Sequence, residues 1–258
     1  MQTDTRSQKI AVAGATGRVG AHLVEILSQR GHDVVPIARS KGVDVVSGEG
    51  LDEALVGAET IIDTATGPSP DQEEATAFFT ASARNLHRAG AVAGAKRIVL
   101  VSIIGIENFQ GGHYPAKVAQ EQALLEGPLP VRIVRAAPFH EYVDQLIGWT
   151  IRDGVAYVPE WRTQLVAARV VAEAVADAAE EPETDNGRIT EIAGPREERL
   201  AEAAAALFAR RGDSIEIREG RQPGDPDAAA YAEGAALPNP GAKLAGPSFE
   251  EWLAAVEV

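Results

Sequence analysis

The sequence predicts an α/β fold, a doubly wound parallel sheet followed by a small C-terminal substrate-binding lobe. Three observations predict it. Short apolar runs alternate with helical patterns through the first half of the chain, and a glycine-rich turn joins the first run to the first helix. Residues 97–102, RIVLVS, hold an uninterrupted apolar run, as in a strand that is covered on both faces. Strands that alternate with helices form right-handed βαβ units, and therefore a parallel sheet.

The alternation can be followed in order along the first 135 residues. The strands are expected at 9–13, 33–38, 60–64, 97–102 and 131–135. The helices between them are expected at 18–30, 72–91 and 115–125. Proline cannot donate to a strand ladder, so Pro36 places the second strand near an end or an edge of the sheet.

The pattern is weaker beyond Pro138. We expect helices at 139–152, 169–181, 200–211 and 249–256, a strand at 188–193, and a loop over 222–247 with a short helix near Tyr231. No repeat or long linker divides the chain. The 258 residues are therefore expected to form a single domain, with a core of residues 8–138 plus 165–194 and a lobe of residues 139–164 and 195–258.

Composition excludes several classes of function. The formal net charge is −14, which repels phosphate backbones and anionic lipid, so we expect neither nucleic acid nor membrane partners. The chain has no cysteine, which excludes disulfides and thiolate chemistry. Its scattered histidines show no metal-site spacing, and His22, His32 and His87 are expected at the surface. The polar N-terminus lacks the apolar segment of a signal peptide, so a cytoplasmic location is expected.

The segment GATGRVG, residues 14–20, lies between the first strand and the first helix. Gly14 permits a tight turn, Gly17 lets the backbone approach a diphosphate, and Gly20 allows close packing of the helix. The helix N-terminus adds free amides and a partial positive charge. A Rossmann-type dinucleotide site is therefore predicted, with cofactor contacts from Gly14, Thr16, Gly17, Arg18, Val19 and Gly20.

The second strand is followed by Arg39, Ser40 and Lys41. An NAD enzyme usually places a carboxylate there for the ribose 2′-hydroxyl, whereas a guanidinium pairs with a 2′-phosphate. This favours NADP, in practice NADPH, over NAD. The three residues after the third strand, Thr64, Ala65 and Thr66, are expected to line the same site.

The carboxyl edge of the sheet also carries candidate catalytic residues. Ser102 ends the fourth strand, and Lys117 follows on the next helix. Tyr114 lies three positions before Lys117, and His113 lies four positions before it. Tyr114 and His113 would therefore face different directions on a helix. Pro115 suits the first helical position, which would leave Tyr114 at the cap. Either Tyr114 or His113 can be the proton donor, or both can be loop residues.

Several segments resemble the NmrA-like atypical short-chain dehydrogenases, among them KIAVAGATGRVG, RIVLVSIIGIENF, YPAKVAQEQALL and VRIVRAAPFHEYVDQL. The resemblance implies that Ser102, a tyrosine and Lys117 act on a carbonyl, with Lys117 also holding the nicotinamide ribose. It implies further that Ala137, Pro138 and Phe139 border the nicotinamide. His140 and Glu141 then face the substrate or cap the next helix, and His140 is a further candidate for proton transfer.

The function expected from these residues is an NADPH-dependent oxidoreductase acting on a small carbonyl, quinone or other conjugated compound. Its expected partner is a small molecule of an aromatic or quinone-like kind. Two alternatives remain: an NADP(H)-binding sensor without turnover, and a redox-neutral isomerase or cyclase on the same fold.

Overall fold

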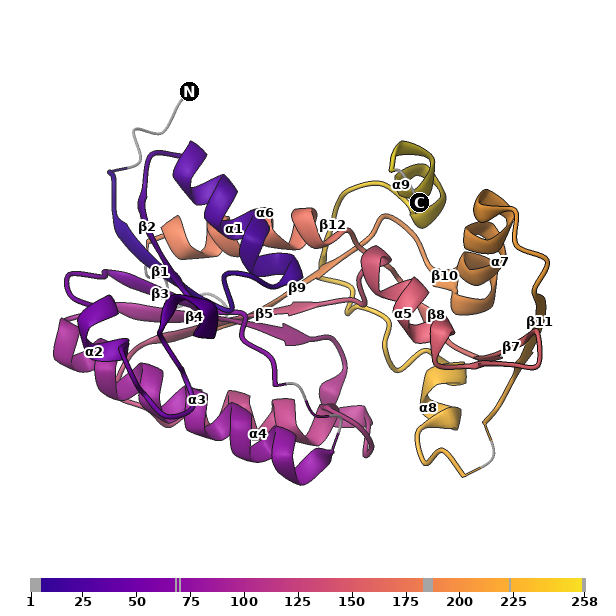
Figure 1. Ribbon diagram of the computed structural model, residues 1–258, viewed down its shortest axis with the longest axis horizontal. Coiled ribbons are helices and arrows are strands. Elements are labelled where there is room, and N and C mark those ends of the chain that lie inside the picture. Colours follow the sequence, from indigo (N-terminus) through magenta and orange to yellow (C-terminus); the bar gives the residue numbers. More distant parts are fainter. Residues whose placement is uncertain (1–5, 68, 70, 183–187, 223, 257–258) are drawn as a thin grey trace. The chain divides into compact units, whose positions relative to one another are not determined.

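A computed structural model describes residues 6–67, 69, 71–182, 188–222 and 224–256 (Figure 1). The chain forms two compact units. Unit 1 comprises Met1–Ser102, Gly112–Val134 and Val171–Thr190. Unit 2 comprises Ile103–Gly111, Arg135–Val170 and Glu191–Val258. The domain limits expected from the sequence stay a prediction.

A parallel sheet forms the centre of unit 1. Its strands are β1 (Lys9–Ala13), β2 (Asp33–Ile37), β3 (Thr60–Asp63), β4 (Arg97–Ile103), β5 (Val131–Ala136) and β9 (Ile189–Ala193). They lie in the order β9-β5-β4-β3-β1-β2, and β12 (Lys243–Leu244) pairs with the end of β9 that belongs to unit 2. β2 pairs with one side of β1, and β3 pairs with the other side, so the order of the strands reverses at β1. This confirms the doubly wound α/β fold, and Pro36 lies on the edge strand as expected.

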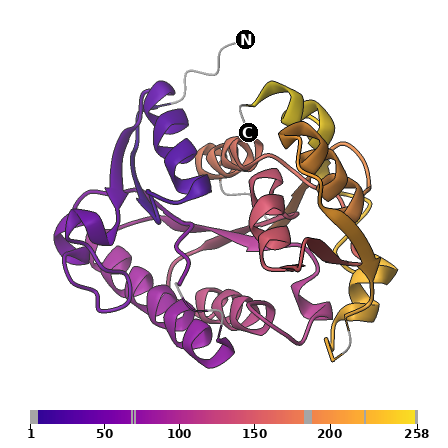
Figure 2. The ribbon, with the colours of Figure 1, turned by 45° about the vertical axis from the view of Figure 1, so that its right-hand side comes forward.

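Helices cover both faces of this sheet (Figures 1 and 2). One face carries α1 (Arg18–Gln29) and α6 (Ala168–Glu180). The other carries α2 (Leu51–Ala54), α3 (Gln72–Ala93) and α4 (Tyr114–Leu125). Between the layers lies an apolar core of side chains with no exposed surface, which includes Ile61, Leu86, Ile98 and Leu100. Burial on both faces explains why these strands are apolar throughout.

Two histidines expected at the surface are buried. His87, on α3, is 3% exposed, and its Nε2 lies 2.8 Å from the carbonyl oxygen of Leu124. A Cβ on Gly127 would lie 2.3 Å from the His87 ring, so the glycine makes room for the imidazole. His32 is 7% exposed and pairs with Glu180. The expectation for these two residues is wrong because α4 covers one side of α3 and α6 lies beside α1.

Unit 2 combines short helices with two small sheets. Its helical segments are η2 (Ile106–Asn108), η3 (His140–Tyr142), α5 (Val143–Gly148), α7 (Leu200–Arg211), α8 (Ala228–Glu233) and α9 (Phe249–Ala255). Its own strands are β6 (Ile151–Arg152), β7 (Val155–Pro159), β8 (Arg162–Thr163), β10 (Glu198–Arg199) and β11 (Glu216–Gly220). They pair in the orders β11-β7-β6 and β10-β8.

The prediction of one continuous helix over residues 139–152 is wrong. The segment begins as η3 and continues as α5, which ends at Gly148, and residues 151–152 form β6. Asp153 and Gly154 then make a tight hairpin turn into β7, with φ values of 50° and 76°. An Asp-Gly pair is the typical sequence of such a turn, since both positions need positive φ. This turn was the overlooked signal.

None of the helices in the described part of the chain is long and apolar enough to cross a lipid bilayer.

Candidate functional site

The glycine corner of unit 1, residues 14–20, joins β1 to α1 and brings backbone segments into close contact. Gly14 has a φ of +76°, and a Cβ there would lie 2.7 Å from the carbonyl oxygen of Thr64. A Cβ on Gly20 would lie only 2.1 Å from the carbonyl oxygen of Gly14. The corner therefore has no room for side chains at Gly14 and Gly20, and Gly20 is what allows α1 to start so close to the loop.

The N-terminus of α1 is open to an anion. Gly17 is the N-cap residue and carries no side chain that could cap the helix, and the first turn contains no acidic residue. A Cβ on Gly17 would meet the carbonyl oxygen of Gly14 at 3.2 Å, a milder contact than at the other two glycines. Helix N-termini of this kind bind phosphates through free amides and the helix dipole.

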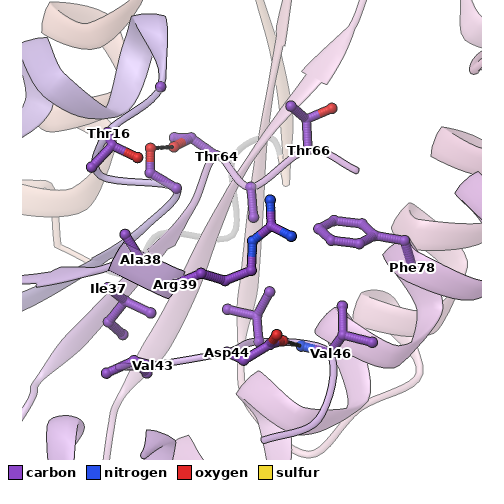
Figure 3. Close-up of a pocket in the computed structure, with 14 residues that line it drawn as sticks. Thr16, Ile37, Ala38, Arg39, Val43, Asp44, Val46, Thr64, Thr66 and Phe78 are labelled. Carbon is purple, nitrogen blue, oxygen red and sulfur yellow. Dashed lines mark hydrogen bonds between the residues drawn. The ribbon is translucent and has the colours of Figure 1, made fainter. Parts of the chain in front are cut away.

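A cavity of about 430 Å³ opens beside this corner, entirely within unit 1 (Figure 3). Seven of the residues predicted to bind the cofactor line it: Gly14, Thr16, Gly17, Arg39, Thr64, Ala65 and Thr66. The side chain of Arg39 extends into the cavity toward Phe78 and Thr66 (Figure 3). Arg39 begins a short 3-10 helix, η1 (Arg39–Lys41), directly after β2. The structure thus brings the glycine corner, the end of β3 and the arginine together around one space.

Sequence reasoning missed the remaining wall of the cavity. It consists of Ile37, Ala38, Val43, Asp44, Val45, Val46 and Phe78. The Asp44 carboxylate accepts hydrogen bonds from the backbone amides of Val46 and Ser47, at 2.6 and 3.2 Å, so it is engaged in closing a turn. An Asp that is followed by such a turn is a recognisable signal, but nothing in the sequence places this turn opposite the glycine corner.

Five predicted cofactor residues of this region do not line the cavity. Val19 and Gly20 lie in the first turn of α1 and are buried. Arg18, Ser40 and Lys41 are exposed beside it, on α1 and η1. Their role in binding stays a prediction.

The predicted catalytic residues of unit 1 gather around the start of α4. This helix begins at Tyr114, with His113 as its N-cap residue and Pro115 second in the helix. The expectation that Tyr114 would be the cap is therefore wrong by one residue. The backbone amide of Lys117 donates to the carbonyl oxygen of His113 at 2.9 Å, so these two residues lie one helical turn apart, on the same side.

Lys117 is 7% exposed, and its ammonium donates to the carbonyl oxygen of Val101 at 2.8 Å and to Oε1 of Gln120 at 2.5 Å. It also lies 5.0 Å from the centre of the Phe79 ring. Burial lowers the pKa of Lys117 to about 8, against the attraction of Asp63 and Glu121. The ammonium thus faces the interior of unit 1 with two of its three N–H groups engaged.

His113 is half-buried and packs edge-on against Phe79, with the ring centres 6.2 Å apart. Burial, followed by the charge of Lys117, lowers the pKa of His113, so its imidazole is neutral at pH 7. Its Nδ1 has no hydrogen-bond partner among the described residues. Ser102 is 2% exposed, and its hydroxyl likewise lacks a partner in the part of the chain that the structure describes. Neither Ser102 nor His113 lines the cavity of about 430 Å³.

The other predicted site residues belong to unit 2. Ala137 is buried, Pro138 and Phe139 are half-buried, and Phe139 forms a bridge with Val166. Both oxygens of Glu141 accept from the backbone amide of Ala168, at 3.2 and 3.0 Å. Glu141 therefore caps the N-terminus of α6, where the helix dipole stabilises a carboxylate.

His140 lines a second cavity, of about 360 Å³, within unit 2. The other lining residues are Glu141, Val143, Asp144, Leu207, Arg211, Phe249, Trp252 and Val256. His140 is 1% exposed, and its Nε2 donates to the carbonyl oxygen of Pro247 at 3.1 Å. Burial lowers its pKa to about 4, so the ring is neutral at pH 7 and its one N–H is bound to a carbonyl.

A glycine corner beneath a helix N-terminus, at the carboxyl edge of a doubly wound parallel sheet, defines a dinucleotide-binding protein with a Rossmann fold. The family model described as NAD(P)H-binding matches residues 14–182. The chain belongs to this NAD(P)H-binding family. A comparison with curated protein sequences finds no match.

Solved structures share the fold at low sequence identity. A nucleoside-diphosphate-sugar epimerase from Staphylococcus aureus is 16% identical, with a TM-score of 0.70 over 95% of this chain and 99% of that chain. MoeE5, solved with UDP-glucose and NAD, is 17% identical, with a TM-score of 0.72 over 95% and 96%. The dTDP-4-dehydrorhamnose reductase from Bacillus anthracis, solved with NADP, is 17% identical, with a TM-score of 0.71 over 96% and 98%. The resemblance to atypical short-chain dehydrogenases is thereby confirmed at the level of an NAD(P)-binding Rossmann fold.

Proposed function

We propose that this protein is an NADP(H)-dependent oxidoreductase acting on a small carbonyl, quinone or other conjugated compound. The observation that carries the NADP(H) proposal is the position of Arg39, a cation that extends into the cavity directly after β2. A carboxylate at this place would repel a 2′-phosphate, whereas a guanidinium forms two parallel hydrogen bonds with it. Among the described residues that line the cavity, Asp44 carries the one carboxylate, and it is held by backbone amides of its own turn.

The glycine corner fits the diphosphate of such a cofactor. Gly14 and Gly20 leave no space for a Cβ, and the uncapped N-terminus of α1 offers amides to an anion. Thr16, Gly17, Thr64, Ala65 and Thr66 supply the rest of the polar lining. When bound, the nicotinamide ring would supply or accept the hydride of the reaction.

The chain's own groups would handle the proton. Ser102 has a buried hydroxyl that is free to orient a substrate oxygen, and the Lys117 ammonium stabilises negative charge nearby. His113 and Tyr114 are both candidates for the proton transfer, and His113 shares its side of the helix with Lys117. His140 fits this role less well, because its only N–H is donated to Pro247.

Isothermal titration calorimetry with NADPH, NADP⁺, NADH and NAD⁺ tests the cofactor part of the proposal. We expect the phosphorylated forms to bind more tightly. Arg39→Ala should weaken NADPH binding about 10- to 100-fold, the value of one or two hydrogen bonds between charged groups, and leave NADH binding nearly unchanged. Arg88→Ala is the matched control, because it removes the same charge from an exposed pair with Asp52 outside the cavity. Tighter binding of NADH by the wild type would overturn the phosphate site, and binding of none of the four would overturn the whole proposal.

Turnover separates the alternatives. NADPH oxidation is measured with quinones, enones, small ketones and nucleotide-linked sugars, the last because a structural neighbour was solved with UDP-glucose. Oxidation of NADPH supports the oxidoreductase. Binding without turnover would instead support a sensor, and product formation without a net change in NADPH would support a redox-neutral enzyme. Single variants His113→Ala and Tyr114→Phe then assign the proton transfer.

A further inference from the structure

Three buried polar side chains of unit 1, Lys117, Gln120 and Asp63, are joined by hydrogen bonds, and no motif of the sequence pointed to the last two. Asp63 ends β3 and Gln120 lies on α4; both have no exposed surface. Oε1 of Gln120 accepts from the Lys117 ammonium at 2.5 Å, and Nε2 of Gln120 donates to Oδ2 of Asp63 at 3.0 Å. The amide therefore bridges a buried cation and a buried carboxylate.

The chain of hydrogen bonds continues from Asp63 into the wall of the cavity. Oδ1 of Asp63 accepts from the backbone amide of Ala65 at 3.0 Å. Thr64, Ala65 and Thr66 line the cavity, and a Cβ on Gly14 would meet the backbone of both Thr64 and Ala65 at 2.7–2.8 Å. The turn that Asp63 holds is thus pressed against the glycine corner.

We propose that Asp63 and Gln120 are positioning residues of the dinucleotide site. Through one buried chain of hydrogen bonds they fix the Lys117 ammonium in position relative to the Thr64–Thr66 wall of the cavity. The proposal rests on the proposed function for the identity of the ligand. Neither residue touches the cavity, so both act through the groups that they hold.

The positioning role follows from the donor-to-acceptor direction of the hydrogen bonds. Each donor faces one acceptor: the ammonium faces an amide oxygen, the amide nitrogen faces a carboxylate oxygen, and the Ala65 amide faces the other carboxylate oxygen. Reversing any single group places two donors or two acceptors against each other, which is costly where water is excluded. The other charged or titratable groups that act on Lys117 are Glu121, which raises its pKa, and His113, whose own pKa the Lys117 charge lowers.

The test exploits this direction. Asp63→Asn leaves an amide oxygen for Ala65 but turns an N–H₂ group toward the nitrogen of Gln120, and rotating Gln120 only moves the conflict to Lys117. Gln120→Glu places two carboxylates against each other. The double variant Asp63→Asn/Gln120→Glu restores every pairing and the net charge, because the carboxylate now faces Lys117 and the new amide at position 63 donates to it.

We expect each single variant to weaken NADPH binding about tenfold. The double variant should return to within about threefold of the wild type, because residues of one hydrogen-bond network are energetically coupled. His87→Leu is the control: it removes another buried hydrogen bond of unit 1 away from the cavity, and should lower the melting temperature without changing NADPH affinity.

A second readout needs no cofactor. With ¹³Cε-labelled lysine, the titration of Lys117 among the five lysines of the chain is followed by NMR and assigned with Lys117→Arg. Its pKa should fall in Asp63→Asn, which removes the negative charge, and recover in the double variant. Absence of coupling in both binding and titration would overturn the positioning role. If the wild type binds no dinucleotide but the titration couples as expected, the proposed function has failed and the buried chain stands as a structural device alone.

Discussion

The two cavities described above, one in each unit, are similar in size but built by different means. One side of the cavity of unit 1, about 430 Å³, is framed by backbone: Gly14, Gly17 and the turn after β3. The cavity of unit 2, about 360 Å³, is framed by side chains: the rings of His140, Phe249 and Trp252 and the ion pair of Arg211 with Asp144 at 2.6 Å. A site made of backbone needs glycines at fixed spacing and is visible in one short segment. A site made of side chains from three helical segments that are distant in the sequence is not visible in any one segment.

The largest expected effect concerns the backbone-built corner. Gly20→Ala places a Cβ 2.1 Å from the carbonyl oxygen of Gly14, so the loop must move. We expect a loss of about 3 kcal/mol in the free energy of unfolding and loss of NADPH binding. Gly148→Ala is the matched control, because Gly148 also lies in a helix and a Cβ there meets nothing within 4 Å. Denaturant unfolding should show Gly148→Ala to be neutral or slightly stabilising. Equal effects would contradict the crowding argument.

A smaller effect is expected in unit 2 and depends on pH. His140 has a pKa of about 4 in the folded chain, below its ordinary value of 6.5, so the unfolded chain binds a proton that the folded chain does not. The contribution of the buried, neutral His140 to the free energy of unfolding is therefore fully present above pH 6.5 and is lost as the pH falls toward 4. Between pH 7 and pH 5 the free energy of unfolding should fall by about 2 kcal/mol more in the wild type than in His140→Phe. Parallel pH curves for the two proteins would show that burial of this imidazole has no such cost.

The smallest effect is expected at the rim of the unit 2 cavity. The Asp144 side chain is 57% exposed, and its pKa is lowered mainly by the hydrogen bond from Arg211. Exposed pairs contribute little, so Asp144→Asn should change the free energy of unfolding by about 0.5 kcal/mol and leave NADPH affinity unchanged. A double-mutant cycle with Arg211→Gln measures the pair itself. A coupling of several kcal/mol would mean that the pair supports the cavity and is more than a rim contact.

The same contrast explains what the sequence could predict. The sheet of unit 1 and its longer helices α1, α3, α4 and α6 follow from hydrophobic periodicity, whereas the four-residue α2 was not predicted. The glycine corner follows from a contiguous motif. The roles of Asp63 and Gln120 could not be predicted, since these residues are 57 positions apart and meet only because β3 and α4 pack together. The start of α4 was misplaced by one residue because a proline is tolerated at the second helical position as well as the first. In unit 2, the helix over residues 139–152 was overextended because its apolar pattern continued past Gly148 into a short strand.

The contact between His87 and Gly127 has a consequence for how the sequence can change over evolution. As long as an imidazole fills the space beside residue 127, every side chain is barred there, whatever its chemistry. A smaller residue at position 87 would lift that restriction and at the same time remove one of the two hydrogen bonds that the carbonyl oxygen of Leu124 accepts from His87 and from the Gly127 amide. Homologous chains should therefore exchange these two positions together, as a pair, and rarely one at a time.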